Sequence, residues 1–223
     1  MATILLLETS TTLCSVGIVQ NGELVAIVEE GSEQYIHAER LHVFISWALE
    51  CAVLQPKDLQ AVCVGRGPGS YTGLRIGVAA AKGMCYALKI PLVAVNSLQV
   101  QASLAPPAEI TISMTDARRM ECYTLVQDSA GNILEPTAAT VLTPESFVNY
   151  ADKNIAIVGD GAAKASGILQ LSKASYYPEL LPSVRGMVQE ANRRYEQGIF
   201  EDLVQFEPFY LKEFIAGTPK QRP

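Results

Sequence analysis

The chain has 223 residues, of which 49% are hydrophobic and 18% charged, so it can bury a sizeable core and is not a largely disordered protein. Its formal net charge is −6 and no Lys/Arg cluster exceeds a pair, which argues against a nucleic-acid binder that acts alone. The sequence lacks an unbroken membrane-length apolar run, a basic signal-peptide start and a CxxC pair among its five cysteines. We therefore expect a cytoplasmic protein with free thiols and no membrane association.

The first hundred residues predict three strands followed by alternating helices and strands. The Asn21–Gly22 dipeptide between two apolar runs is typical of a hairpin turn. Ser70 and either Asn96 or Ser97 are suited to cap helices. From apolar spacing we expect strands over 3–7, 13–19 and 23–29, a helix over 35–54, a strand over 61–65, a helix over 70–88, a strand over 91–95 and a helix to 104.

The proline-containing stretch 105–108 predicts a boundary, after which the pattern restarts. The expected elements are strands over 109–114 and 121–127, a third after a turn at 129–132, a helix over 144–150, a strand over 154–158, a short helix, and a last helix from a Ser183 cap to 197. This order favours an α/β protein with the two-lobed actin-like, ribonuclease-H-like (ASKHA) fold, in which mixed sheets are flanked by helices. We expect one lobe over 1–104 and a smaller one over 105–223, with a last helix that can return to the first lobe.

Five glycines fall within residues 65–77, but they match neither the dinucleotide fingerprint nor the P-loop. Gly73, Gly77, Ala81 and Cys85 instead form a row of small residues at helical spacing, which lets another backbone approach closely. This row could receive the chain's own first helix or a helix of a partner subunit. Trp47 on the first helix could likewise be an interface anchor or a half-buried core residue.

Several segments closely resemble those of the TsaB family, in the same order and over essentially the whole chain. The most specific is GPGSYTGLRIG at 67–77, followed by AKG at 81–83. The others are ILLLETS at 4–10, HAERL at 37–41, DARRMECY at 116–123 and GDG at 159–161.

This resemblance implies a role in making threonylcarbamoyladenosine beside the anticodon of tRNA. A larger relative, TsaD, transfers the threonylcarbamoyl group, TsaB pairs with it and the ATPase TsaE joins them. TsaB proteins also form homodimers through a similar helical face, and tRNA is reached only through the complex. The residues expected at the partner interface are His37, Glu39, Leu41, Trp47, Gly69, Gly73, Arg75, Gly77 and Ala81.

The sequence also argues against catalysis by this chain. Transferases of this family hold a metal through an HxxxH motif, whereas the two histidines here, His37 and His42, are five residues apart. On a helix they point about 140° apart, so one ion cannot readily join them. We expect no catalytic residue, no metal and no cofactor of the chain's own. The alternative is an enzyme in its own right, either an ASKHA-type ATPase or kinase or a glycopeptidase-like hydrolase.

Polar residues at the strand ends could still receive the phosphate of a nucleotide, ATP or ADP, near the complex interface. They are Glu8, Thr9, Ser10, Asp116, Gly159, Asp160 and Gly161. The other interpretation, which we favour, is that the hydroxyl groups only bond the backbone where the strand ends. Arg66, Arg75, Arg118 and Arg119 lie close to the family motifs and could contact a partner or tRNA phosphate, or be solvated. We favour Arg75 because it lies in the interface-like helix.

Overall fold

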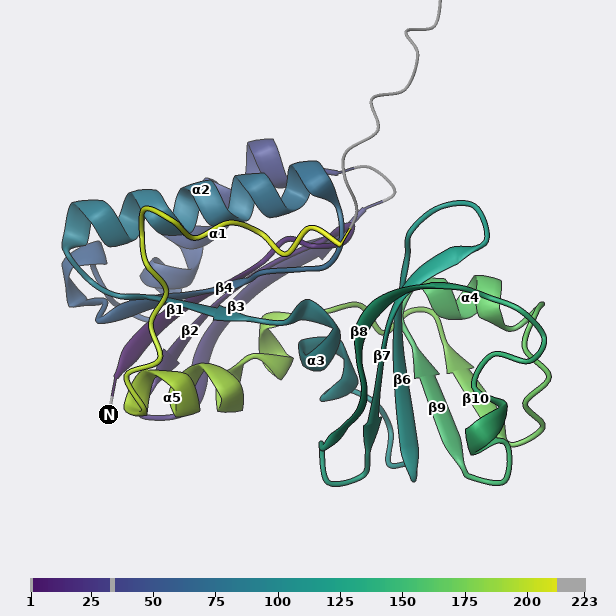
Figure 1. Cartoon of the computed structure of the whole chain (residues 1–223). Coiled ribbons are helices and arrows are strands. Elements are labelled where there is room, and N and C mark those ends of the chain that lie inside the picture. The colour runs from purple at the N-terminus through teal and green to yellow at the C-terminus, as the bar shows by residue number, and fades with distance from the viewer. Residues whose placement is uncertain (1, 33–34, 212–223) are drawn as a thin grey trace, which may run out of the picture.

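A computed structural model describes residues 2–32 and 35–211, which form two lobes side by side, each built on a five-stranded sheet (Figure 1). The first sheet has the order β3-β2-β1-β4-β5 and consists of β1 (Thr3–Glu8), β2 (Leu13–Gln20), β3 (Glu23–Gly31), β4 (Ala61–Gly65) and β5 (Leu92–Val95). The second has the order β10-β9-β6-β7-β8 and consists of β6 (Ile110–Asp116), β7 (Glu121–Asp128), β8 (Ile133–Val141), β9 (Ile155–Val158) and β10 (Ala174–Tyr177). In both sheets an antiparallel hairpin continues into parallel strands, as expected for this fold class.

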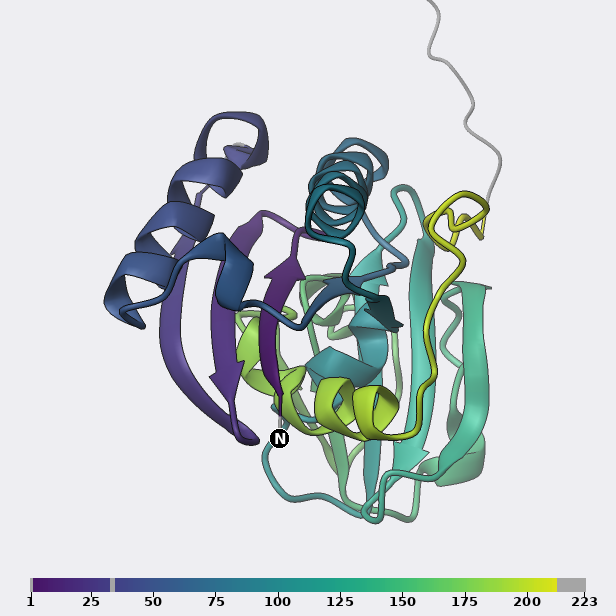
Figure 2. The same ribbon diagram turned by 90° about the vertical axis from the view of Figure 1, so that its left-hand side faces the viewer.

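Helices cover both faces of the first sheet (Figure 2). Helices α1 (His37–Cys51) and α2 (Tyr71–Leu88) lie on one face, because their apolar residues recur at helical spacing and pack on β1, β2 and β4. Helix α5 (Val188–Glu196) lies on the other face, where Met187 and Ala191 are buried against the same strands. Between the lobes lies α3 (Ser97–Ala102), capped by the Asn96 side chain, which accepts hydrogen bonds from the backbone N–H groups of residues 98 and 99.

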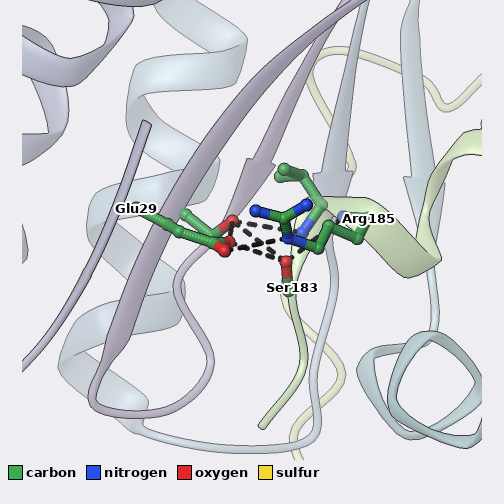
Figure 3. Close-up of polar contacts among 5 residues, drawn as sticks. Glu29, Ser183 and Arg185 are labelled. Carbon is green, nitrogen blue, oxygen red and sulfur yellow. Dashed lines mark hydrogen bonds and ion pairs between the residues drawn. The ribbon is translucent and has the colours of Figure 1, made fainter. Parts of the chain in front are cut away.

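The chain returns to the first lobe through a polar cluster before α5 (Figure 3). Ser183 caps the short 3-10 helix η3 (Val184–Gly186), and its hydroxyl donates to Oε2 of Glu29 on β3 at 2.8 Å. The Arg185 guanidinium bonds the other oxygen of Glu29 at 3.0 Å, and the Ser15 hydroxyl on β2 donates to Oε2 at 2.9 Å. Because each Glu29 oxygen has a donor, this cluster holds η3 and α5 on the first lobe although they follow the second in sequence.

Residues 199–211 then run along α2 and the β5 edge. The backbone N–H of Glu201 donates to the Leu92 carbonyl at 2.9 Å, and Phe206 is buried in the first core. The Lys82 ammonium donates to the carbonyls of Val204 at 3.2 Å and Phe206 at 3.1 Å. This segment therefore covers an edge strand whose hydrogen-bonding groups would otherwise be free.

The predicted α/β class is confirmed, as is the order of three strands followed by alternating helices and strands in the first lobe. The helix predicted over 144–150 is wrong: only a 3-10 turn, η2 (Val148–Tyr150), forms there, because Phe147 turns into the second core with a φ of 63°. Strand β10 was not predicted. Within the described part of the chain, no helix is long and apolar enough to cross a bilayer.

Candidate functional site

The glycine row of α2 faces the first lobe itself. A Cβ atom at Gly73 would lie less than 3.0 Å from the Thr9 carbonyl oxygen, and one at Gly77 less than 3.0 Å from the Thr9 hydroxyl. A Cβ atom at Gly69 would meet the Ser10 carbonyl oxygen equally closely. These glycines therefore let α2 and its preceding loop pack against the turn that follows β1.

We expected this row to receive either the chain's own first helix or a helix of a partner subunit, and the turn after β1 occupies it instead. Gly73, Gly77 and Ala81 are buried inside the lobe, and so are Leu41 and His37 on α1. The reason is geometric, since this row lies beside the apolar stripe by which α2 packs on the sheet.

His37 has a structural contact at the start of α1. Its Nε2 lies 2.7 Å from the Thr11 carbonyl oxygen and its ring makes an edge contact with Tyr35, with ring centroids 5.6 Å apart. Burial of the imidazole lowers the pKa of His37 below its ordinary value. His37 thus ties α1 to the turn after β1 and does not lie on the surface.

Of the remaining predicted interface residues, Gly69 is partly buried, and Glu39, Trp47 and Arg75 are on the surface. The Trp47 side chain is 46% exposed and stacks on Phe44, with ring centroids 5.7 Å apart. The Arg75 guanidinium lies 4.5 Å from the Tyr71 ring centroid, and its Nε donates to the Tyr210 hydroxyl at 3.3 Å. Arg75 is thus held by aromatic neighbours of its own chain.

The residues that the sequence reasoning missed lie on the opposite side of α2. Ala79, Gly83 and Tyr86 are exposed, and a Cβ atom at Gly83 would meet no other element within 4 Å in the described part of the chain. Val43 on α1 is exposed as well. The signal was present in the sequence, because the apolar stripe of α2 identifies the buried side and hence the outward one. We call Val43, Trp47, Ala79, Gly83 and Tyr86 the outer helical face.

The turn after β1 is fully buried. The Glu8 carboxylate accepts from the Ser10 backbone N–H and from the Ser97 hydroxyl, each at 2.8 Å. Burial nevertheless raises the pKa of Glu8. The hydroxyl groups of Thr9 and Ser10 are buried and have no hydrogen-bond partner among the residues that the structure describes. A phosphate could reach these groups only if the surrounding residues moved apart, so a nucleotide here stays a prediction.

The matching loops of the second lobe also pack closely. The Asp116 backbone N–H donates to the Asp160 carboxylate at 2.8 Å, and Lys164 forms an ion pair with the Asp116 side chain. Burial raises the pKa of Asp160. Gly159 has a φ of 103°, and Cβ atoms at Gly159 and Gly161 would meet residue 114 in less than 3.0 Å. The GDG loop therefore fits tightly against β6.

Comparisons with known proteins agree with this architecture. The family model for TsaD, tRNA N6-adenosine threonylcarbamoyltransferase, matches residues 32–213. The tRNA threonylcarbamoyladenosine biosynthesis protein TsaB of Haemophilus influenzae is 30% identical, with 96% of this chain and 95% of the relative covered. TsaB of Escherichia coli K12 is 27% identical over 96% of both chains. The structure of YeaZ from Pseudomonas aeruginosa superposes with a TM-score of 0.81 at 27% identity, covering 95% of this chain and 100% of the other.

The similarity over the whole length of the relatives and the structural superposition support the same family as the segments that the sequence shares with TsaB. The family model shows that the chain is also related to the transferase. The chain therefore belongs to the TsaB family of tRNA threonylcarbamoyladenosine biosynthesis proteins, within the wider family described by the threonylcarbamoyltransferase model.

Proposed function

We propose that this chain is the non-catalytic partner of a TsaD-type threonylcarbamoyltransferase and supports formation of threonylcarbamoyladenosine beside the tRNA anticodon in the cytoplasm. A TsaE-type ATPase completes the complex. Whole-length similarity to TsaB proteins supports this role. This chain matches the family model of the transferase itself, so the two proteins are related. Related chains that share a fold can pair through equivalent surfaces, as the subunits of a symmetric homodimer do, and this supports the proposed pairing.

The two histidines support the non-catalytic part of the proposal. His37 is buried and bonded to the Thr11 carbonyl, whereas His42 is exposed on α1. A metal ligand must offer a free ring nitrogen toward the same ion as its companions. Because these two rings lie on different sides of α1, they do not form the histidine pair that the family's transferases use.

The outer helical face is the surface on which we place the partner, and its exposure is the observation that carries this assignment. Trp47 is 46% exposed, Tyr86 80% and Val43 37%, although large apolar side chains normally avoid water. Ala79 and Gly83 are exposed on α2, where the absence of bulk permits close approach of another helix. A homodimer would use the same face and so compete with the transferase.

The test combines size-exclusion chromatography with a TsaD-type partner and mass-spectrometric measurement of the modified nucleoside. Gly83→Leu places a side chain on the outer helical face without a clash inside the lobe, since an added Cβ there would meet no described atom within 4 Å outside the backbone of α2. Ala163→Leu, on the exposed side of α4 (Gly161–Ala165), is the matched control. We expect Gly83→Leu to lose the partner and Ala163→Leu to keep it.

Two results would contradict the proposal. The first is nucleoside formation by the isolated chain at the rate of the complete complex, which would make this chain the enzyme. The second is unchanged association by Gly83→Leu, which would remove the partner from the outer helical face. Gly77→Leu is unsuitable for this test because it disturbs packing inside the lobe.

A further inference from the structure

The hairpin between β6 and β7 carries two consecutive arginines in the left-handed backbone region. Arg118 has a φ of 69° and Arg119 a φ of 55°. Outside glycine, asparagine and aspartate, this region is unfavourable because Cβ crowds the backbone. The turn is held by the Asp116 carboxylate, which accepts from the Arg118 N–H at 2.6 Å, and by the Glu121 N–H, which donates to the Arg118 carbonyl at 3.2 Å.

Another hairpin of the same chain has residues that suit the left-handed backbone region. In the hairpin between β2 and β3, the two consecutive residues with positive φ are Asn21 at 55° and Gly22 at 87°. Asparagine and glycine adopt this conformation with little strain. The arginines at 118 and 119 are therefore poorly suited to their turn, and strain of this kind tends to persist where a side chain serves a function.

Both arginine side chains are exposed. Among the described residues, neither guanidinium forms an ion pair, whereas Arg185, Arg193 and Arg194 each have a carboxylate partner. The neighbouring Asp116 carboxylate is engaged by the Lys164 ammonium and by backbone N–H. Two adjacent guanidinium groups thus point into solvent from a chain whose formal net charge is −6.

The other arginines near the family motifs are differently placed. The Arg66 guanidinium lies between two aromatic rings, 5.9 Å from the centroid of Phe206 and 5.5 Å from that of Phe209. Arg75 is held by aromatic side chains in the same way. The structure therefore reverses our preference for Arg75, because Arg118 and Arg119 are exposed in the hairpin between β6 and β7 of the second lobe.

We propose that Arg118 and Arg119 contact phosphate groups of the tRNA substrate. Guanidinium matches phosphate in charge and in its bidentate geometry, and each contact releases counterions from the nucleic acid. An acidic protein surface is the less favoured ligand, because this turn lies on the other lobe from the outer helical face that we assign to the partner. The inference rests on the proposed function, since it takes the substrate to be tRNA.

The test measures binding of an unmodified tRNA transcript to the complex of this chain with a TsaD-type transferase. Fluorescence anisotropy is recorded between about 50 and 200 mM salt, where phosphate contacts dominate the salt dependence. The main variant is R118N/R119G, which copies the favourable residues of the first-lobe hairpin. The second, R118Q/R119Q, keeps long side chains and removes the charges. The control, K57Q/K173Q, removes the same charge from two exposed lysines elsewhere.

We expect both arginine variants to bind tRNA about tenfold or more weakly, with a salt slope shallower by about 2, one for each lost phosphate contact. The control should bind like the wild type. R118N/R119G should also melt a few degrees higher, because it relieves backbone strain while it weakens binding. Such opposite effects on stability and binding would not arise from partial unfolding.

Three results would overturn the inference. Unchanged affinity and slope in both arginine variants would exclude phosphate contact at this turn. Equal weakening in the control would show that net charge alone matters. Loss of the transferase from the arginine variants on size-exclusion chromatography would assign the turn to a protein contact. If the wild type itself fails to bind the transferase, the proposed function fails first, and this outcome is distinguishable from the other three.

Discussion

Replacement by alanine should change the free energy of unfolding in opposite directions at two glycines of α2. Each Gly→Ala change in a helix interior gains up to about 1 kcal/mol from backbone entropy and helix propensity. At Gly83 no described part of the chain opposes this gain, because an added Cβ would meet no described atom within 4 Å beyond the nearby backbone of α2 itself. We therefore expect Gly83→Ala to raise the free energy of unfolding by about 0.5–1 kcal/mol and the melting temperature by about 2–4 °C.

Gly73→Ala should destabilise the protein. The added Cβ would lie less than 3.0 Å from the Thr9 carbonyl oxygen and 3.0 Å from Cδ2 of the buried His37 ring. A backbone oxygen cannot rotate away, so α2 would have to shift, and overpacking of this kind costs about 1–3 kcal/mol. Because Gly73 is in the first turn of α2, the propensity gain is small and the clash should dominate.

Urea unfolding followed by circular dichroism measures both changes, with the midpoint and the slope fitted separately. The two variants differ by the same methyl group in the same helix, so each is the control of the other. A Gly73→Ala variant as stable as the wild type would refute the close approach of α2 to the turn after β1. Marked destabilisation by Gly83→Ala would show that its side of α2 is packed within the chain.

Three further predictions concern a buried acid, a thiol and a strained helix end. Burial in the native state raises the pKa of Glu8 above its ordinary value of 4.5. The Glu8 side chain therefore contributes most to the free energy of unfolding below pH 4.5, and this contribution is lost as the pH rises through the higher native pKa. Glu8→Gln should therefore gain stability relative to the wild type as the pH rises above 4.5 in urea titrations; a difference that stays constant with pH would contradict this. A thiol reagent should label Cys51 first, because the other four cysteines are buried; rapid labelling of a second thiol without denaturant would contradict that assignment. Val53 has a φ of 56° just after α1 and is 90% exposed, so Val53→Gly should raise the unfolding free energy by about 0.5–1 kcal/mol, measured by thermal melting; a lower melting temperature would show that the valine makes a stabilising contact.

The local pattern determined much of the fold. Apolar runs, the Asn21–Gly22 turn and the candidate caps at Ser70 and at Asn96 or Ser97 predicted the first-lobe elements, because these signals act within a few residues. The helix predicted over 144–150 failed for the converse reason. There the burial of Phe147 in the second core outweighs local helix preference. Short β10 forms only because β9 offers it a hydrogen-bonding edge.

The family membership also followed from the sequence, since motifs such as GPGSYTGLRIG are specific in themselves. The sequence did not determine, however, whether each motif faces the interior of the chain or its surface. A row of small residues permits close packing, but the sequence does not say whether the chain's own turn or another subunit fills the space. Only the tertiary structure shows Thr9 against Gly73 and Gly77, and Gly83 open to solvent. In the same way, the sequence favoured Arg75 over Arg118 as a contact residue, and only the fold shows that Arg75 lies against aromatic rings and that Arg118 is exposed at a turn.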